Sequence, residues 1–246
     1  MNQYPKTRAG SQPEYLHQAY EATIRRAPSH PLIQLPHTLS ELTGPIYGHN
    51  PIGPTDNDLT SHFTEPPQGE RIIVAGRVLD EDGRGVPNAL VEVWHANHLG
   101  NYSYFDASQP AFNLRRSIRT DSAGNYSFTS VVPVGYSVPP AGKTQQLLDQ
   151  LGRHGHRPAH IHFFVSASGH RKLTTQINID GDPYLWDDFA FATRDGLVPA
   201  LKKAEGAEGK PYGVEGQFVL IDFDFTLFKE RDDVKSTEVE RVRVGA

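Results

Sequence analysis

The residues best suited to chemistry lie in the histidine-rich stretch Leu151–His162, which reads LGRHGHRPAHIH and holds four of the twelve histidines. An apolar, β-prone segment follows, so we expect a strand over residues 159–165 that places His160 and His162 on one face. Two imidazoles at this spacing on a strand can bind one metal ion, which the same spacing on a helix would prevent. The proline after Arg157 presents that arginine on a short, rigid turn. Taken alone, such a pair is more often two polar positions on a solvated strand.

Two tyrosines beside glycines extend the metal hypothesis. Tyr102 follows an expected strand that ends at Trp94, and Tyr136 follows one that ends at Val132. Each can point back over the sheet, although a single tyrosine in such a place is usually a packed residue with a bonded hydroxyl. Phenolate is a hard anionic oxygen donor that suits Fe(III). Together with the two histidines, the tyrosines suggest a two-Tyr, two-His iron site.

A β framework must position these residues. Glycine (22) and proline (19) are plentiful and regular helical periodicity is scarce, as is typical of a loop-rich β protein. We expect further strands over residues 71–79, 89–94, 116–120, 126–132, 173–179 and 217–228, and a short helix over 144–151. The turns at 80–85 and 121–124 are typical of β-hairpins. The predicted fold is mainly β: a β-sandwich of about seven or eight strands with long loops and few short helices.

The first 67 residues have a different character. Residues 1–31 are polar and punctuated by prolines, with one short helix expected over residues 14–26, and residues 31–67 are expected to form extended pieces and turns. We interpret residues 1–67 as an N-terminal arm and extended segment that packs on a catalytic sandwich domain of residues 68–246.

Composition excludes several classes of protein. Hydrophobic residues make up 37%, and no apolar run approaches the ~20 residues of a membrane span. The first residues, MNQYPKTRAGSQPEY, lack the apolar core of a signal peptide. Without cysteine, disulfides and thiolate metal sites are ruled out. A net charge of −5 with interspersed signs argues against nucleic acid as a partner. We expect a cytoplasmic protein.

The longer motifs resemble the intradiol ring-cleavage dioxygenases. WHANHLGNYSYFD, AFNLRRSI, PVGYSVPP, LLDQLGRHGHRPAHIH and DPYLWDDFAFATRDGL resemble catechol 1,2-dioxygenases. AYEATIRRAP, LPHTLSELTGP, GPTDNDLT and GERIIVAGRVLDEDGRGVPNALVEVW instead resemble the β subunit of protocatechuate 3,4-dioxygenase. The chain shows no counterpart of the long helical dimerisation region with which the catechol enzymes begin. The chain therefore resembles a hybrid of these two subfamilies.

The resemblance implies a non-haem Fe(3+) enzyme that cleaves catechol-type substrates with O2 to cis,cis-muconate-type products, in aromatic hydrocarbon catabolism through the β-ketoadipate pathway. It implies the metal ligands Tyr102, Tyr136, His160 and His162, with Tyr136 as the axial ligand that substrate releases. It implies Arg157 and Gln176 as active-site residues. The implied substrate contacts are Tyr20, for a ring carboxylate, and the pocket wall Leu42, Pro45, Ile46, Phe189 and Ala190. His154, His156 and His170 receive no role and are expected at the surface. Either a homo-oligomer or an assembly with an α-type partner subunit is implied.

Two other classes of function use the same strands. The pattern V-x-D-x-x-G-x-x-V-P-x-A-x-V-x-V followed by T-D-x-x-G-x-Y-x-F is common in adhesive and carrier sandwiches that need no metal. That interpretation accounts for the strands and leaves the tyrosines, histidines and Arg157 unexplained. An iron-free partner subunit is the third interpretation, and the intact ligand set speaks against it. Within the enzyme class, catechol, protocatechuate and hydroxyquinol remain open as substrates.

Overall fold

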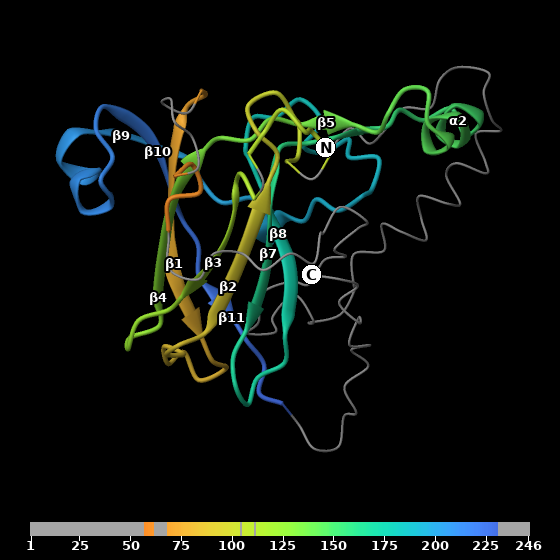
Figure 1. Ribbon diagram of the computed structural model, residues 1–246. Coiled ribbons are helices and arrows are strands. Elements are labelled where there is room, and N and C mark those ends of the chain that lie inside the picture. Colours follow the sequence, from red (N-terminus) through yellow and green to blue (C-terminus); the bar gives the residue numbers. More distant parts are fainter. Residues whose placement is uncertain (1–56, 62–67, 104, 111, 231–246) are drawn as a thin grey trace.

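The computed structural model describes residues 57–61, 68–103, 105–110 and 112–230, and it is a sandwich of two β-sheets with the core between them (Figure 1). The five-stranded sheet contains β1 (Arg71–Leu79), β4 (Asn125–Val131), β9 (Lys202–Glu205), β10 (Gln217–Asp222) and β11 (Phe225–Thr226). The four-stranded sheet has the order β3 (Arg115–Arg119), β2 (Leu90–His95), β7 (His160–Ser166), β8 (Leu173–Asn178). The predicted mainly β sandwich is confirmed, with nine strands of the described residues in its two layers.

Smaller elements gather at one end of the sandwich. β5 (Tyr136–Ser137) and β6 (His156–Arg157) form a two-stranded ribbon there, and α2 (Lys143–Gln150) lies beyond it (Figure 1). Three 3-10 turns complete the described elements: η2 (Asp195–Leu197), η3 (Gly206–Glu208) and η4 (Lys210–Tyr212). Of the predicted helices, the one over residues 144–151 is confirmed by α2.

The core is built by alternate residues of facing strands. Ile72 and Val74 from one sheet and Ile161 and Phe163 from the other belong to the same buried cluster. Phe128 and Phe163 meet across the layers with ring centroids 6.2 Å apart. Truncation of such a side chain to alanine costs about 3–5 kcal/mol, because it loses its transfer free energy and leaves a cavity.

The strand register of the four-stranded sheet determines which residues line its face opposite to the core. Across β3, β2, β7 and β8, the partners Arg115, Trp94, His162 and Gln176 form one row. Directly paired residues of an antiparallel sheet share a face. Because Ile161 faces the core, this row lies on the face turned away from it.

Both predicted hairpins are wrong. β1 and β2 belong to different sheets, and so do β3 and β4, so the turns at 80–85 and 121–124 carry the chain from one layer to the other. The two turns lie against each other: the Val78 N–H donates to the Gly124 carbonyl at 2.8 Å, and a Cβ on Gly124 would lie 2.8 Å from the Gly85 Cα. Alternation of apolar residues shows that each strand has one buried face. The same pattern arises when two strands pair within one sheet and when they pack face to face in two different sheets.

The single long strand expected over residues 217–228 is also wrong, because β10 ends at Asp222 and β11 begins at Phe225. Between them the Phe223 carbonyl occupies the space that a side chain on Gly76 would need. The Asp224 carboxylate accepts the Arg77 N–H at 2.7 Å in place of a backbone carbonyl. The strand therefore bends where it runs beside β1.

The last part of the predicted arm is joined to the core. Leu59 is fully buried in the main cluster, and its N–H donates to the Thr129 carbonyl at 2.9 Å. Residues 1–56, which include the helix expected over 14–26, and residues 62–67 lie outside the described residues. The division into 1–67 and 68–246 stays a prediction.

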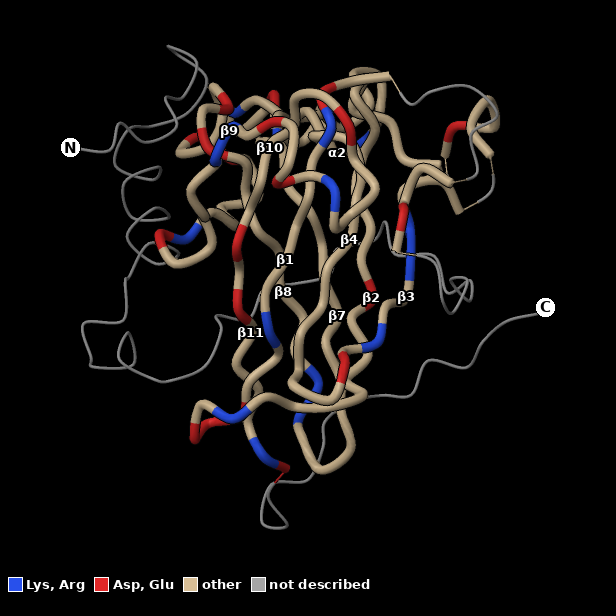
Figure 2. The backbone as a smooth tube through the Cα atoms, turned by 90° about the vertical axis from the view of Figure 1, so that its left-hand side faces the viewer, with Lys and Arg blue, Asp and Glu red and all other residues tan. Residues whose placement is uncertain are grey.

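Positions of Lys and Arg and positions of Asp and Glu are interspersed along the described backbone (Figure 2). Of the helices in the described ranges, none combines the length and the apolar character that crossing a bilayer requires. The cytoplasmic location stays a prediction.

Candidate metal centre

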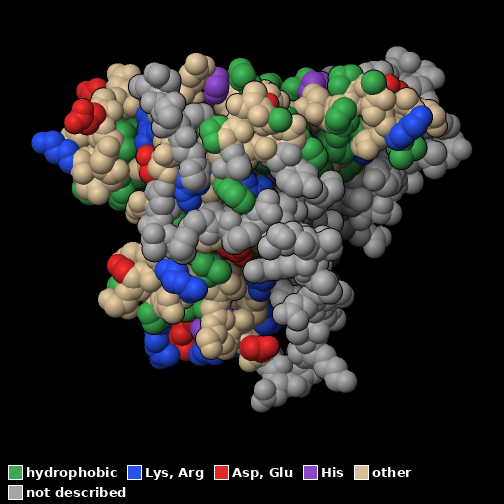
Figure 3. Space-filling model, viewed as in Figure 1, with side chains coloured by type: hydrophobic (Ala, Val, Ile, Leu, Met, Phe, Trp, Pro, Cys, Tyr) green, Lys and Arg blue, Asp and Glu red, His purple; other side chains and the backbone are tan. Residues whose placement is uncertain are grey.

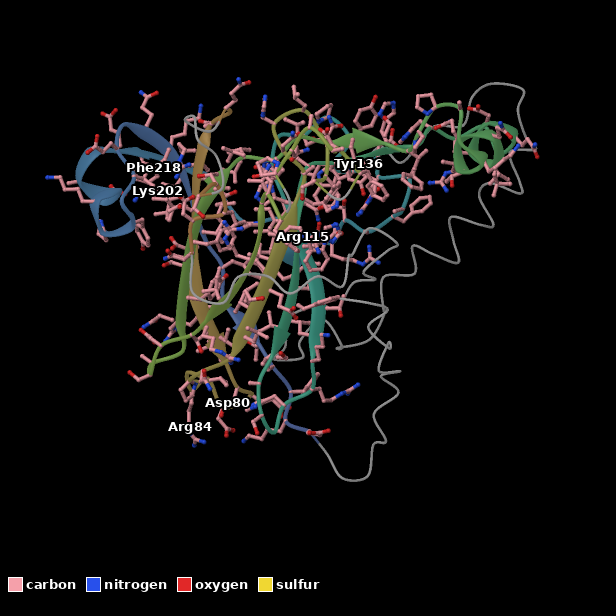
Figure 4. The ribbon with its side chains drawn as sticks, in the orientation of Figure 1. Asp80, Arg84, Arg115, Tyr136, Lys202 and Phe218 are labelled. Atoms are coloured by element: carbon pink, nitrogen blue, oxygen red, sulfur yellow. The ribbon has the colours of Figure 1, made fainter. Side chains whose placement is uncertain are left out.

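The four predicted ligands lie together over the end of the four-stranded sheet. The Nε2 atoms of His160 and His162 are 3.0 Å apart, and the Tyr102 Oη lies 3.5 Å from the His160 Nε2. The Tyr136 ring is 5.6 Å from the His160 ring and 5.4 Å from the Tyr102 ring, centroid to centroid. Figure 4 shows Tyr136 at the upper end of the molecule, far from Asp80 at the opposite end.

Strand alternation turns both imidazoles toward this site. His160 and His162 are buried on the face of β7 opposite to Ile161 and Phe163, as the sequence predicts. The Pro158 carbonyl lies 2.6 Å from the His160 Nδ1 and accepts a hydrogen bond from its N–H, so that the lone pair with which imidazole binds a cation is on Nε2. Burial, reinforced by the charge of Arg157, lowers the pKa of both histidines well below its ordinary value. Both are therefore neutral at pH 7, the state in which imidazole binds metals.

The tyrosines differ in their access to solvent. Tyr102 is buried, and burial together with the neighbouring Tyr136 raises the pKa of its hydroxyl well above the ordinary value. Tyr136 is half-buried on the short β5 strand. A bound cation favours the phenolate form and would reverse the effect of burial on Tyr102.

The donor set fits a hard, trivalent ion. Metal–nitrogen bonds are about 2.0–2.1 Å long, so nitrogens 3.0 Å apart can bind one ion in adjacent positions. Within the described ranges, no three side chains of His, Cys, Asp or Glu are grouped to hold a metal, so the tyrosines are needed to complete a site. Two neutral imidazoles and two phenolates match Fe(III) better than a soft or divalent ion.

Two glycines let the tyrosine-bearing loops approach each other. Gly100 has a φ of 82°, and a Cβ there would lie 2.8 Å from the Gly135 carbonyl oxygen. A Cβ on Gly135 would lie 2.6 Å from the Arg157 carbonyl oxygen. A larger residue at Gly100 would collide with the loop that carries Tyr136, and one at Gly135 would collide with the strand that carries Arg157.

An aromatic wall closes one side of the site. The Trp94 indole stacks on the His162 imidazole, with centroids 4.9 Å apart and planes 7° from parallel. Trp94, Tyr102 and Phe164 belong to one small buried cluster beside the main core. The sequence reasoning did not assign this role to Trp94, whose only signal was its place at the end of an apolar strand.

A third buried histidine lies between the two sheets. His95 is 1% exposed, its Nδ1 lies 2.7 Å from the Ala96 carbonyl and its Nε2 lies 2.7 Å from the Ser130 hydroxyl. Burial lowers its pKa to about 4. The imidazole is therefore neutral, donating from Nδ1 to the carbonyl and accepting the hydroxyl at Nε2.

Arg157 and Gln176 lie beside the predicted ligands. The Arg157 Nη1 is 3.0 Å from the His160 Nε2, and its Nη2 donates to the Gln176 Oε1 at 3.0 Å. Burial alone would lower the pKa of Arg157, but Asp188 and Tyr136 outweigh it and raise the pKa above its ordinary value. A permanent charge with several N–H donors therefore faces the donor set.

The predicted pocket wall is described only in part. Phe189 is half-buried and Ala190 is exposed; both follow Asp188, whose carboxylate contacts Arg157. Tyr20, Leu42, Pro45 and Ile46 lie outside the described residues. Exposed apolar side chains occur on the tyrosine loops at Leu99, Phe105 and Val134. Figure 3 shows further hydrophobic surface at the same end, around β5 and α2.

The three histidines expected at the surface, His154, His156 and His170, are each half-buried. His156 stacks on Tyr184 with centroids 4.3 Å apart. The His154 Nε2 lies 3.0 Å from the Asp187 Oδ1 without hydrogen-bond alignment. The sequence contains no local signal for these contacts, because Tyr184 and Asp187 are supplied by a distant loop.

A cavity of about 850 Å³ lies elsewhere, lined by residues of both sheets that include Arg77, Tyr126 and Asp222. It contains none of the predicted ligands.

Comparison with known proteins places the chain among dioxygenases. A family model described as "Dioxygenase" matches residues 42–227, and one described as "Protocatechuate 3,4-dioxygenase beta subunit N terminal" matches residues 4–38. Catechol 1,2-dioxygenase 2 of Acinetobacter lwoffii is 80% identical over 142 residues, which are 58% of this chain and 51% of that protein. The protocatechuate 3,4-dioxygenase beta chain of Burkholderia cepacia is 38% identical over 232 residues, 88% of this chain and 93% of that one.

A solved structure shares the fold. The crystal structure of wild-type Acinetobacter radioresistens catechol 1,2-dioxygenase has a TM-score of 0.78 and 44% identity, covering 94% of this chain and 75% of that one. This chain spans only 51–60% of the length of the Acinetobacter catechol dioxygenases with which it was compared in sequence.

Proposed function

This chain belongs to the intradiol dioxygenase family, and from that premise we propose that it cleaves catechol-type aromatic rings with O2, using a non-haem Fe(III) ion. The products would be cis,cis-muconate-type dicarboxylic acids. One observation carries the proposal: Tyr102, Tyr136 and the β7 pair His160 and His162 come from three separate parts of the chain and lie together.

The proposed ligands would have different roles in such a reaction. Fe(III) held by the four donors would supply Lewis acidity that lowers the pKa of both substrate hydroxyls. Tyr136 is suited to accept a substrate proton at its Oη, because it is half-buried and lies on a two-residue strand, whereas Tyr102 is enclosed. Tyr136 is therefore the proposed ligand that substrate displaces.

The polar side chains beside the ligands are suited to stabilise charge. Arg157 and Gln176 would offer hydrogen bonds to the negative charge that develops on the ring, and the burial of both side chains would strengthen these bonds. Trp94 closes the side of the site next to His162. Phe189 and Ala190 are the members of the proposed pocket wall that lie within the described residues.

Substrate choice within the family is a finer proposal. We propose activity on catechol, and on protocatechuate when Tyr20 of the N-terminal arm contacts the ring carboxylate, because residues 4–38 match the protocatechuate β-subunit model. Hydroxyquinol is the alternative substrate. Measuring O2 uptake and product absorption with these three compounds tests the proposal, and an iron-loaded enzyme that consumes no O2 with any of them would contradict it.

The assembly is also a proposal. We propose that the chain works as an oligomer, either of its own copies or with an α-type partner. An iron-free partner subunit and a metal-free binding module are the competing functions. Metal analysis of the chain purified alone separates them, because only the proposed enzyme would retain iron.

A further inference from the structure

Asp188 holds the guanidinium of Arg157 through two nearly parallel contacts. Its Oδ1 accepts from the Arg157 Nε and its Oδ2 from the Nη2, both at 3.2 Å. The Asp188 side chain is 1% exposed, and that of Arg157 is 10% exposed. Because a guanidinium is planar, a two-point contact with a carboxylate fixes its direction as well as its position.

The carboxylate is itself fixed by its own loop. The Ala190 N–H donates to the Asp188 Oδ1 at 3.0 Å, and the Ala192 N–H donates to the Oδ2 at 3.2 Å. Each oxygen therefore accepts one backbone N–H and one guanidinium N–H. The carboxylate cannot turn without losing several of these bonds.

The edge of Arg157 that Asp188 leaves uncovered faces the predicted ligands. The Nη1 lies 3.0 Å from the His160 Nε2, and the Nη2 also donates to the Gln176 Oε1 at 3.0 Å. The Asp188 contact therefore determines which guanidinium nitrogen is presented to the site.

The backbone secures the same arrangement. The Phe189 N–H donates to the His156 carbonyl at 3.1 Å, next to Arg157, and the Arg153 Nη2 donates to the Phe189 carbonyl at 2.6 Å. The segment 188–190 is thus hydrogen-bonded to the strand that carries Arg157, and it also contains the proposed pocket-wall residues.

We propose that Asp188 is a positioning residue: it orients the Arg157 guanidinium toward the site where substrate charge develops. This inference deepens the proposed function and rests on it. It goes beyond loop capping, because a purely structural Asp188 would need only its bonds to Ala190 and Ala192.

The Asp188→Asn variant separates the two roles. An asparagine oxygen can still accept a backbone N–H, so the loop is kept, while the bidentate acceptor and its charge are lost. We expect kcat to fall on the order of tenfold with little change in KM and full iron retention, because the loss falls on transition-state stabilisation. Asp187→Asn is the matched control, since Asp187 contacts His154 rather than Arg157, and it should leave kcat unchanged.

Chemical rescue tests the contact directly. In Arg157→Ala, added guanidinium chloride at low, non-denaturing concentration should restore part of the lost kcat, because Asp188 offers a preformed fork for that ion. In the Arg157→Ala/Asp188→Asn double variant the rescue should vanish. Equal rescue in both backgrounds would overturn the proposal.

Two further measurements keep the test decisive. Methylammonium carries the same charge as guanidinium but cannot make a two-point contact with a carboxylate, so methylammonium chloride should not rescue Arg157→Ala. Equal rescue by both cations would also overturn the proposal. This comparison remains valid even if Asp188→Asn fails to fold. The iron-free Arg157→Ala protein should show a higher Tm in guanidinium chloride than in equimolar KCl, and the double variant should not. This last readout needs no turnover, so a failure of the positioning role is distinguished from a failure of the proposed dioxygenase function.

Discussion

The indole of Trp94 and the imidazole of His162 lie face to face, 4.9 Å apart, on neighbouring strands of the four-stranded sheet. The strand pairing fixes the backbones of both residues, and the stacking fixes the rotation of the imidazole. A predicted metal ligand is therefore oriented by an apolar neighbour as well as by its own strand.

We expect Trp94→Phe to keep the fold and to weaken Fe(III) retention on the order of tenfold, as is typical when a group that supports a metal ligand is changed. Titration with a competing chelator measures this effect. Phe128→Leu, a core change in the other sheet, is the control for general destabilisation. The orienting role is lost if the two variants release iron equally.

The proposed ligand set predicts the colour of the protein. The purified chain should hold about one iron and absorb visible light, because phenolate-to-Fe(III) charge transfer requires coordinated tyrosine. Tyr102→Phe and His160→Ala should each reduce the iron content measured by plasma emission spectrometry, because each removes a donor atom. Tyr126→Phe is a suitable control, since that buried tyrosine donates to the Phe223 carbonyl. A colourless chain that retains iron would show that the phenolates do not bind it.

His95 makes stability depend on pH. Its pKa is about 4 in the folded protein and 6.5 in the unfolded chain, so the unfolded chain binds more protons between these values. The free energy of unfolding should therefore fall as pH drops from 6.5 to 4, by roughly 3 kcal/mol from this residue alone. Urea unfolding at pH 7 and pH 5 should show a smaller loss for His95→Gln than for the unaltered chain. Parallel losses would mean that His95 does not titrate on unfolding.

The arm prediction concerns residues that the structure does not describe. If Tyr20 contacts a substrate carboxylate, removal of residues 1–28 should lower kcat/KM for protocatechuate and spare that for catechol. Tyr20→Phe should reproduce part of the change, because only the hydroxyl is lost. An unchanged ratio of the two kcat/KM values in both variants would point to a plain catechol 1,2-dioxygenase.

Strand positions were predictable because apolar alternation is a local property of the chain. It placed His160 and His162 correctly on the face of β7 opposite to Ile161. It could not reveal that β3 pairs with β2 rather than β4, because both sheets contribute to one core. The turn residues at 121–124 predicted where the chain turns, but they could not predict to which sheet the next strand belongs.

The candidate site divides in the same way. Residue types and spacing suggested the ligand set, the family resemblance implied the same four residues, and the structure adds their spatial proximity. The Asp188–Arg157 contact spans 31 residues of sequence, and an acid in a loop gives no local signal of its partner. Trp94 was likewise visible only as an apolar strand residue.

The alternation along β7 has a consequence for how the protein matures. A slip of one residue in its pairing would turn both imidazoles into the core and expose Ile161 and Phe163 on the site face. Hydrophobic burial thus enforces the correct placement of His160 and His162, because a strand paired out of register by one residue turns both imidazoles away from Tyr102 and Tyr136. Iron capture should therefore serve as a reporter of correct strand registration: during refolding, colour should develop no earlier than burial of the core.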